Sequence, residues 1–237
     1  MWRMLAVMVL LLPRLAHADP AFTVRQAIDA HGGAEALRKY PAFTAKMRGT
    51  MTMSGAEVPF TGNVAMQVPG KYRLEINLEL AGQKVSIVQV VNGDAVSQTA
   101  GGIEIPLGDA MRSELKQMAL MQELTMLTSL NDAKRFTLKE EKTGDKRATI
   151  IAVRAKGMKD VKMFFDNKTG LLVKMQRQAI NPEMRMISED TLLDGYQSIQ
   201  GVMVPLRSSA MHDGKPFMNL VFSDYQMLEK LDDATFK

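Results

Sequence analysis

Alternating apolar and polar residues dominate the chain after residue 42 and predict a β-rich protein. Phe43, Ala45 and Met47 alternate with Thr44 and Lys46, and the next two segments continue the same period of two. A strand with this pattern has one face in the core and the other in water, as in an antiparallel meander. Strands are expected over residues 43–53, 58–68, 71–80, 84–91, 135–140, 148–155, 161–166, 171–180, 184–193, 202–212 and 215–227.

Two segments break this period and predict helices. Residues 22–39 carry an apolar stripe at helical spacing, which Gly32-Gly33 interrupts. Residues 109–130 contain neither Gly nor Pro and are rich in good helix formers. This middle helix has two apolar stripes, so we expect it to be covered on more than one side. The first stripe holds Met111, Leu115, Met118 and Met126, and the second holds Leu120, Leu124 and Leu127.

Together these elements predict an α+β, mainly β fold. About eleven strands would form a strongly curved, open antiparallel sheet, an unclosed β-barrel whose concave face is covered by the helices. Nothing in the sequence resembles a domain linker, so residues 19–237 are expected to form a single domain. The helices would either fill the concave face or leave a ligand cavity between helix and sheet, and periodicity leaves both arrangements open.

The N-terminus predicts export. Arg3 precedes an apolar run that is too short to span a bilayer, and Ala16-His17-Ala18 has small residues where a signal peptidase cleaves. We therefore expect residues 1–18 to be a signal peptide that is cleaved after Ala18. No cysteine follows that could carry a lipid, so the mature form should be a periplasmic protein that does not span the membrane.

Composition narrows the possible partners. Removal of the signal peptide leaves 219 of the 237 residues, with 28 basic against 26 acidic side chains, too small an excess to predict nucleic-acid binding. The chain has no cysteine, so its stability in an oxidising compartment must come from the core rather than from disulfides.

Motifs for catalysis or metal binding are missing from the sequence. The two histidines of the mature chain, His31 at an apparent helix end and His212 at a hairpin tip, are isolated from each other and from any cysteine. We interpret His31 as a cap or a partly exposed residue. No nucleophile elbow and no glycine-rich phosphate loop is present. The sequence thus predicts no catalytic residue, no metal site and no cofactor.

Methionine is unusually frequent, with 20 residues in 237. Unbranched thioethers repack readily and suit a surface that accepts varied apolar ligands, although they also serve as ordinary core residues. If the concave face binds a ligand, we expect apolar side chains of the first strands and of the middle helix to line the site. These are Met47, Met51, Val64, Met66, Leu74, Ile76 and Leu78 on the sheet, with Met111, Leu115, Met118 and Met121 on the helix.

Short motifs along nearly all of the mature chain resemble, in order, the LolA/LolB-type outer-membrane lipoprotein carrier superfamily, in its lipoprotein-sorting-protein-like branch. The resemblance lies in the leading helix 24–40, the strand 43–53, Val68-Pro69-Gly70-Lys71-Tyr72-Arg73, the hairpin 90–94, the segment 164–173, Asp194-Gly195-Tyr196 with the following 201–205, and the tail 231–236. It implies an unclosed β-barrel that holds acyl chains or another lipid-like ligand under its helices. Val68 replaces the arginine that helps the specialised carrier to latch its lid, and Ala95-Val96-Ser97-Gln98 replaces the carrier's aromatic residues.

These departures favour a general binder of hydrophobic molecules over a dedicated lipoprotein carrier. The sequence therefore predicts a non-catalytic periplasmic carrier or binding protein whose partners are lipids or the acyl chains of lipoproteins, with possible envelope protein partners. The alternative is a sensory or protein-interaction module of the same fold that transports no cargo.

Overall fold

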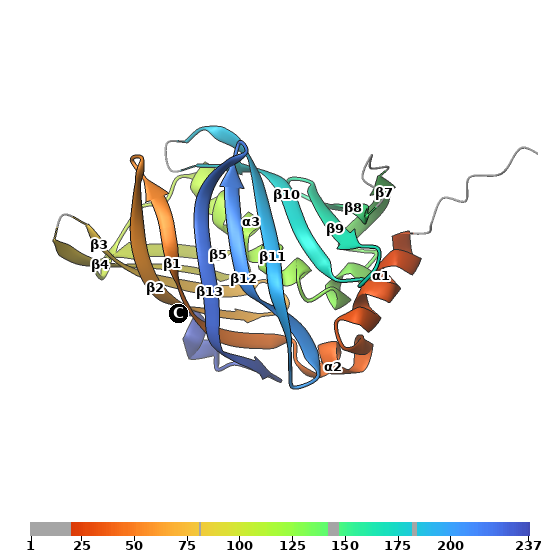
Figure 1. The fold of residues 1–237 in the computed structure, drawn as a ribbon. Helices are drawn as coiled ribbons and strands as arrows, with labels where there is room; N and C mark the ends of the chain where they lie inside the picture. The colour runs from red at the N-terminus through yellow and green to blue at the C-terminus, as the bar shows by residue number, and fades with distance from the viewer. Residues whose placement is uncertain (1–19, 81, 142–146, 182–183) are drawn as a thin grey trace, which may run out of the picture.

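The computed structural model describes residues 20–80, 82–141, 147–181 and 184–237. The expected signal peptide, residues 1–18, lies outside these ranges. The described residues include thirteen strands that form one antiparallel sheet, which curves around the helices without closing (Figure 1). The strands are β1 (Ala42–Met53), β2 (Ala56–Gln67), β3 (Lys71–Leu80), β4 (Gln83–Asn92), β5 (Ala95–Ala100), β6 (Ile103–Glu104), β7 (Phe136–Glu141), β8 (Ala148–Ala155), β9 (Val161–Asp166), β10 (Leu172–Ile180), β11 (Met186–Ile199), β12 (Val202–His212) and β13 (Lys215–Leu228).

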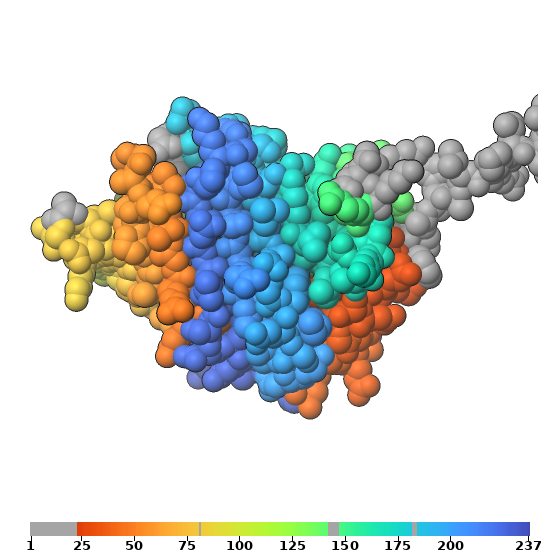
Figure 2. All heavy atoms as spheres, viewed as in Figure 1, coloured from red at the N-terminus to blue at the C-terminus, as the bar shows by residue number. Residues whose placement is uncertain are grey.

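Two meanders make up this sheet. Its order is β6-β5-β4-β3-β2-β1-β13-β12-β11-β10-β9-β8-β7. Neighbouring strands are therefore consecutive in sequence except for β1 and β13, and the consecutive strands β6 and β7 lie at opposite edges. The register of this central pair runs from Ala42 opposite Leu228 to Met51 opposite Met218. In Figure 2 these two strands run side by side over the outer face of the molecule.

Close backbone approach explains Gly49 in the middle of β1. A Cβ atom at this position would lie 1.9 Å from the carbonyl oxygen of Asn219 on β13, far inside contact distance. Only glycine fits there, and glycine in a strand often marks such an approach or a sharp bend. The central pair therefore owes its close packing to this residue.

The helices cover the concave face. They are α1 (Pro20–Ala30), α2 (Gly33–Lys39), α3 (Asp109–Leu124) and the 3₁₀ turn η1 (Thr128–Asn131), and they share a single apolar cluster with the inward-facing residues of the strands. A second 3₁₀ turn, η2 (Asp233–Phe236), places Phe236 in a small cluster with Ala65 and Val90 on the opposite face.

The fold class expected from the sequence is confirmed. The strand count is thirteen rather than about eleven, because the short β5 and β6 lack clear alternation. The middle helix ends at Leu124 instead of residue 130, since Leu127 has a positive φ of 58° and the chain turns into η1. None of the described helices is long and apolar enough to cross a membrane.

Candidate ligand-binding site

The eleven residues predicted to line a ligand site all lie on the concave face or on α3, but at different depths. Seven are buried, namely Met47, Val64, Met66, Leu74, Leu78, Leu115 and Met121, with 8% exposure or less. Met51, Ile76 and Met118 are half-buried and pack against the apolar cluster, whereas Met111 is half-buried outside it. Their role in binding stays a prediction.

Two hollows of the described surface lie away from most of the predicted lining residues. A groove of about 570 Å³ is bordered by the outward-facing side chains of Lys46, Asn63 and Arg73, and includes only Val64 of the predicted lining residues. A second hollow of about 400 Å³ lies beside α1 and the turn at 166–170. The concave interior is tightly filled where α3 meets β10, because Leu115 and Met175 are each only 1% exposed.

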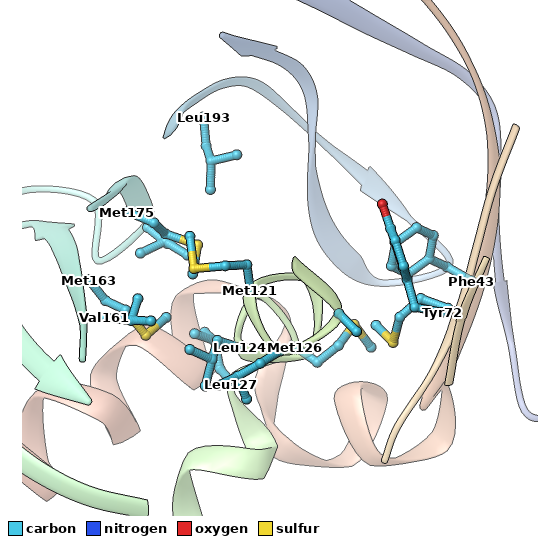
Figure 3. Packing of buried hydrophobic residues seen from close by; sticks show 14 of the residues in the cluster. Phe43, Tyr72, Met121, Leu124, Met126, Leu127, Val161, Met163, Met175 and Leu193 are labelled. Atoms are coloured by element: carbon cyan, nitrogen blue, oxygen red, sulfur yellow. The ribbon is translucent and has the colours of Figure 1, made fainter. Parts of the chain in front are cut away.

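Methionines line the interior where α3 crosses the second meander. Met121 of α3 reaches toward Met175 of β10 (Figure 3), and Met163 of β9 is the register partner of Met175. All three belong to the apolar cluster. Because thioether side chains change rotamer easily, this part of the interior can repack more readily than one built of Leu and Ile. The sequence-based prediction included Met121 but omitted the two strand methionines.

Ion pairs join α3 to the same strands. Glu114 Oε1 lies 2.5 Å from Nη1 of Arg177, and the side chains are only 5% and 3% exposed. The backbone N–H of Ile180 donates to Glu114 Oε2 at 3.0 Å, and Nζ of Lys159 lies 3.6 Å from the same oxygen. Arg177, the Ile180 N–H and Lys159 thus form a site on the sheet that binds the Glu114 carboxylate, the carboxylate site.

A second carboxylate holds Arg177 from the other side. Nε of Arg177 donates to Glu189 Oε1 at 2.8 Å, and Nε2 of His212 lies 3.2 Å from Glu189 Oε2. Burial opposes ionisation of Glu189, but the hydrogen bond to His212 and the charge of Arg177 outweigh it and lower the pKa of this carboxyl. His212 lies at the end of β12, next to the hairpin tip, and its ring also stacks on Phe217.

Further polar contacts hold the rest of α3 against neighbouring segments of the chain. The side-chain amide of Gln117 donates to the carbonyl of Lys159 at 3.1 Å and accepts from its N–H at 3.0 Å. Glu123, 2% exposed, pairs with Arg135 at 2.6 Å and accepts from the N–H of Gly70 at 3.1 Å. Because each buried polar group is matched, the helix has one defined position over the sheet.

His31 was predicted to be a cap or a partly exposed residue, and the second of these alternatives is wrong. It is 3% exposed, its Nδ1 lies 2.7 Å from the carbonyl oxygen of Ala27, and its ring meets Tyr196 edge to face. Burial lowers the pKa of His31, although the contact with Ala27 acts in the opposite direction. His31 therefore helps to pack α1 against the sheet.

A sequence signal for the Arg177 cluster did exist. In β10, Arg177 falls between Met175 and Ala179 in the inward phase, and in β11, Glu189 falls between Ile187 and Thr191. Opposite charges at inward positions of two adjacent strands predict a buried pair. Glu114 gives no such signal, because charged residues are common in helices and its burial depends on tertiary packing.

Solved structures resemble the whole chain, although no family model and no curated protein matches it. A LolA superfamily protein from Nitrosomonas europaea superposes with a TM-score of 0.58 at 14% identity, covering 93% of this chain and 98% of that one. The fold is that of the LolA superfamily. Two further solved structures have a similar fold. A DUF1329 family protein from Desulfovibrio piger superposes with a TM-score of 0.58 at 12% identity, covering 93% of this chain and 98% of that one. A putative outer membrane lipoprotein-sorting protein domain from Vibrio parahaemolyticus superposes with a TM-score of 0.53 at 9% identity, covering 92% of this chain and 97% of that one.

Proposed function

We propose that the protein is an exported, non-catalytic carrier or binding protein for lipid-like molecules in the periplasm, with residues 19–237 as its mature domain. The observation that carries this proposal is the methionine-lined interior between α3 and β9–β10. The LolA-like fold supports it, because the Vibrio parahaemolyticus neighbour is described as a lipoprotein-sorting domain.

Binding would exchange core contacts for ligand contacts. The interior is filled when no ligand is present, so an acyl chain must move side chains such as Met121 and Met175 aside. Each methylene that leaves water contributes about 0.8 kcal/mol, so a few ordered methylenes offset a modest repacking cost. The predicted lining residues of β1–β3 would extend this path along the concave face.

Native mass spectrometry of the protein from its own envelope tests the proposal directly and should show a bound lipid. In parallel, the fluorescent fatty acid cis-parinaric acid should bind saturably and be displaced by palmitate. Met175→Gln keeps an unbranched side chain but adds an amide to the interior, and should weaken binding about tenfold. Met186→Gln, at a position 58% exposed, is the matched control. The carrier function would be refuted if the protein from the envelope carried no lipid and the fatty-acid probe showed no saturable binding.

Exposed apolar side chains favour a second candidate, a protein-interaction module. Ile103 is 72% exposed, and Met184 and Met186 are 56% and 58% exposed. A module of this kind would bind an envelope protein through such residues and keep its interior filled. In-cell cross-linking that requires Ile103 or Met184, in a protein that carries no lipid, would favour it.

A further inference from the structure

The carboxylate site on the sheet is complete without the helix residue that occupies it. Arg177, the Ile180 N–H and Lys159 all belong to β10 or to the turn between β8 and β9, whereas Glu114 comes from α3. A guanidinium, a backbone N–H and an ammonium group are the donors with which proteins bind anions. The sheet therefore presents an anion-binding site, and the helix supplies its occupant.

Arg177 would keep its position if Glu114 withdrew. Its Nε remains bonded to Glu189, so one carboxylate holds the guanidinium while Nη1 faces the other. A charge-neutral pair would then persist in the sheet, which avoids the large cost of a buried unpaired cation. The Glu114 position is thus exchangeable, and the Glu189 position is fixed.

Apolar side chains continue inward from this site. Met175 precedes Arg177 by two residues on the same face of β10, and Met121 follows Glu114 by two turns on the same face of α3. On the outer side, the Lys159 side chain is 32% exposed, so the carboxylate site borders solvent there. A molecule with a carboxylate at one end and a flexible apolar chain at the other matches both parts.

We propose that the ligand is an amphiphile with a carboxylate head group, which takes the place of the Glu114 carboxylate on Arg177 and on the Ile180 N–H. Its chain enters the interior past Met121, Met163 and Met175. Glu114 is then a built-in competitor that holds α3 on the sheet while the site has no ligand. The inference rests on the proposed lipid-binding function and adds the head group that the protein recognises.

Two helix variants test this competition. Glu114→Gln keeps the size of the side chain but removes its charge, so its hold on Arg177 weakens. Glu123→Gln is the matched control, because it weakens another buried ion pair of α3 away from the carboxylate site. Each protein is titrated with cis-parinaric acid and with its uncharged methyl ester, and urea unfolding checks that the variant is folded.

We expect the wild type to bind the acid at least tenfold more tightly than the ester, which equals about 1.4 kcal/mol. Glu114→Gln should bind the acid at least fivefold more tightly than the wild type does and change ester binding less than twofold. Glu123→Gln should affect acid and ester alike. If Glu114→Gln does not fold, Glu114→Asp withdraws the carboxylate by one methylene and should shift acid binding in the same direction.

Several results would overturn the inference. Equal affinity for acid and ester in the wild type would show that the head group is not recognised, although lipid binding itself would stand. An acid-selective gain in Glu123→Gln would mean that loosening α3 suffices. Displacement of the probe by excess acetate would show a site for small carboxylates rather than amphiphiles. If neither probe binds any of the proteins, the proposed function fails together with the inference.

Discussion

Replacing Arg177 with methionine should destabilise the protein far more than the same replacement at Arg207. The Arg177 side chain is 3% exposed, and its removal deprives two carboxylates of their guanidinium. Of their described side-chain partners, Glu114 would keep only the more distant Lys159, at 3.6 Å, and Glu189 only His212, at 3.2 Å. Loss of one partner of a buried ion pair costs about 3–5 kcal/mol. Arg207 also pairs with a carboxylate, that of Asp194 at 2.7 Å, but these side chains are 60% and 73% exposed. An exposed pair contributes less than about 1 kcal/mol.

Urea unfolding of the two variants measures this difference. A loss of about 3–5 kcal/mol is a large part of the 5–15 kcal/mol by which most domains are stable. It corresponds to a melting temperature lower by about 6–20 °C for a domain of this size. Adding Glu114→Gln to Arg177→Met should restore part of the stability, because it removes the charge of one of the two buried carboxylates that lose the guanidinium. Equal midpoints for Arg177→Met and Arg207→Met would refute the view that the cluster is effectively desolvated.

Three further predictions concern pH, the helix and export. Burial lowers the pKa of His31 below its ordinary value of 6.5, so the stability that neutral His31 provides is complete above pH 6.5 and is lost as pH falls below it. Urea midpoints of wild type and His31→Phe between pH 8 and 5 should show this slope in the wild type only. Leu115→Asp places a carboxylate at a site 1% exposed and should unfold the protein. Met118→Asp, at a half-buried site, should remain folded but bind cis-parinaric acid at least tenfold more weakly. Unchanged binding by Met118→Asp would show that Met118 does not line the site. The intact mass of the envelope protein should start at Asp19 without attached lipid, and a mature form that retains Trp2 would disprove the predicted cleavage.

Local patterns were enough to predict most of the fold. Alternation at Phe43, Ala45 and Met47 identified β1 and its buried face, because a half-buried strand must alternate. The same reasoning failed for β5, where Val96 is the one buried residue in a segment of small and polar side chains. The helix prediction continued past Leu124 because the residues that follow are good helix formers, and only tertiary packing turns the chain there.

The contact of α3 with the polar part of the candidate site is a pairing that no short sequence pattern contains. Glu114 and Arg177 are 63 residues apart, and their contact exists only because α3 crosses the sheet above β10. Apolar periodicity gave the stripe through Leu115 and Met118 but not the buried charge beside it. The predicted ligand site was therefore a plausible apolar surface that lacked the groups able to orient a ligand.

The pairing of β1 with β13 determines when this protein can complete its fold. Each meander can form from strands that are close in sequence, but the pair that joins them needs residues from both ends of the domain. Contacts of such long range are slow to form. During synthesis, the edge of β1 would stay without its partner until the last strand emerged, and an unpaired edge is prone to aggregate. A chain truncated before Lys215 would keep the first meander and the second without β13, and would expose the edge of β1 in the middle of the sheet, where Gly49 lets the two backbones approach closely.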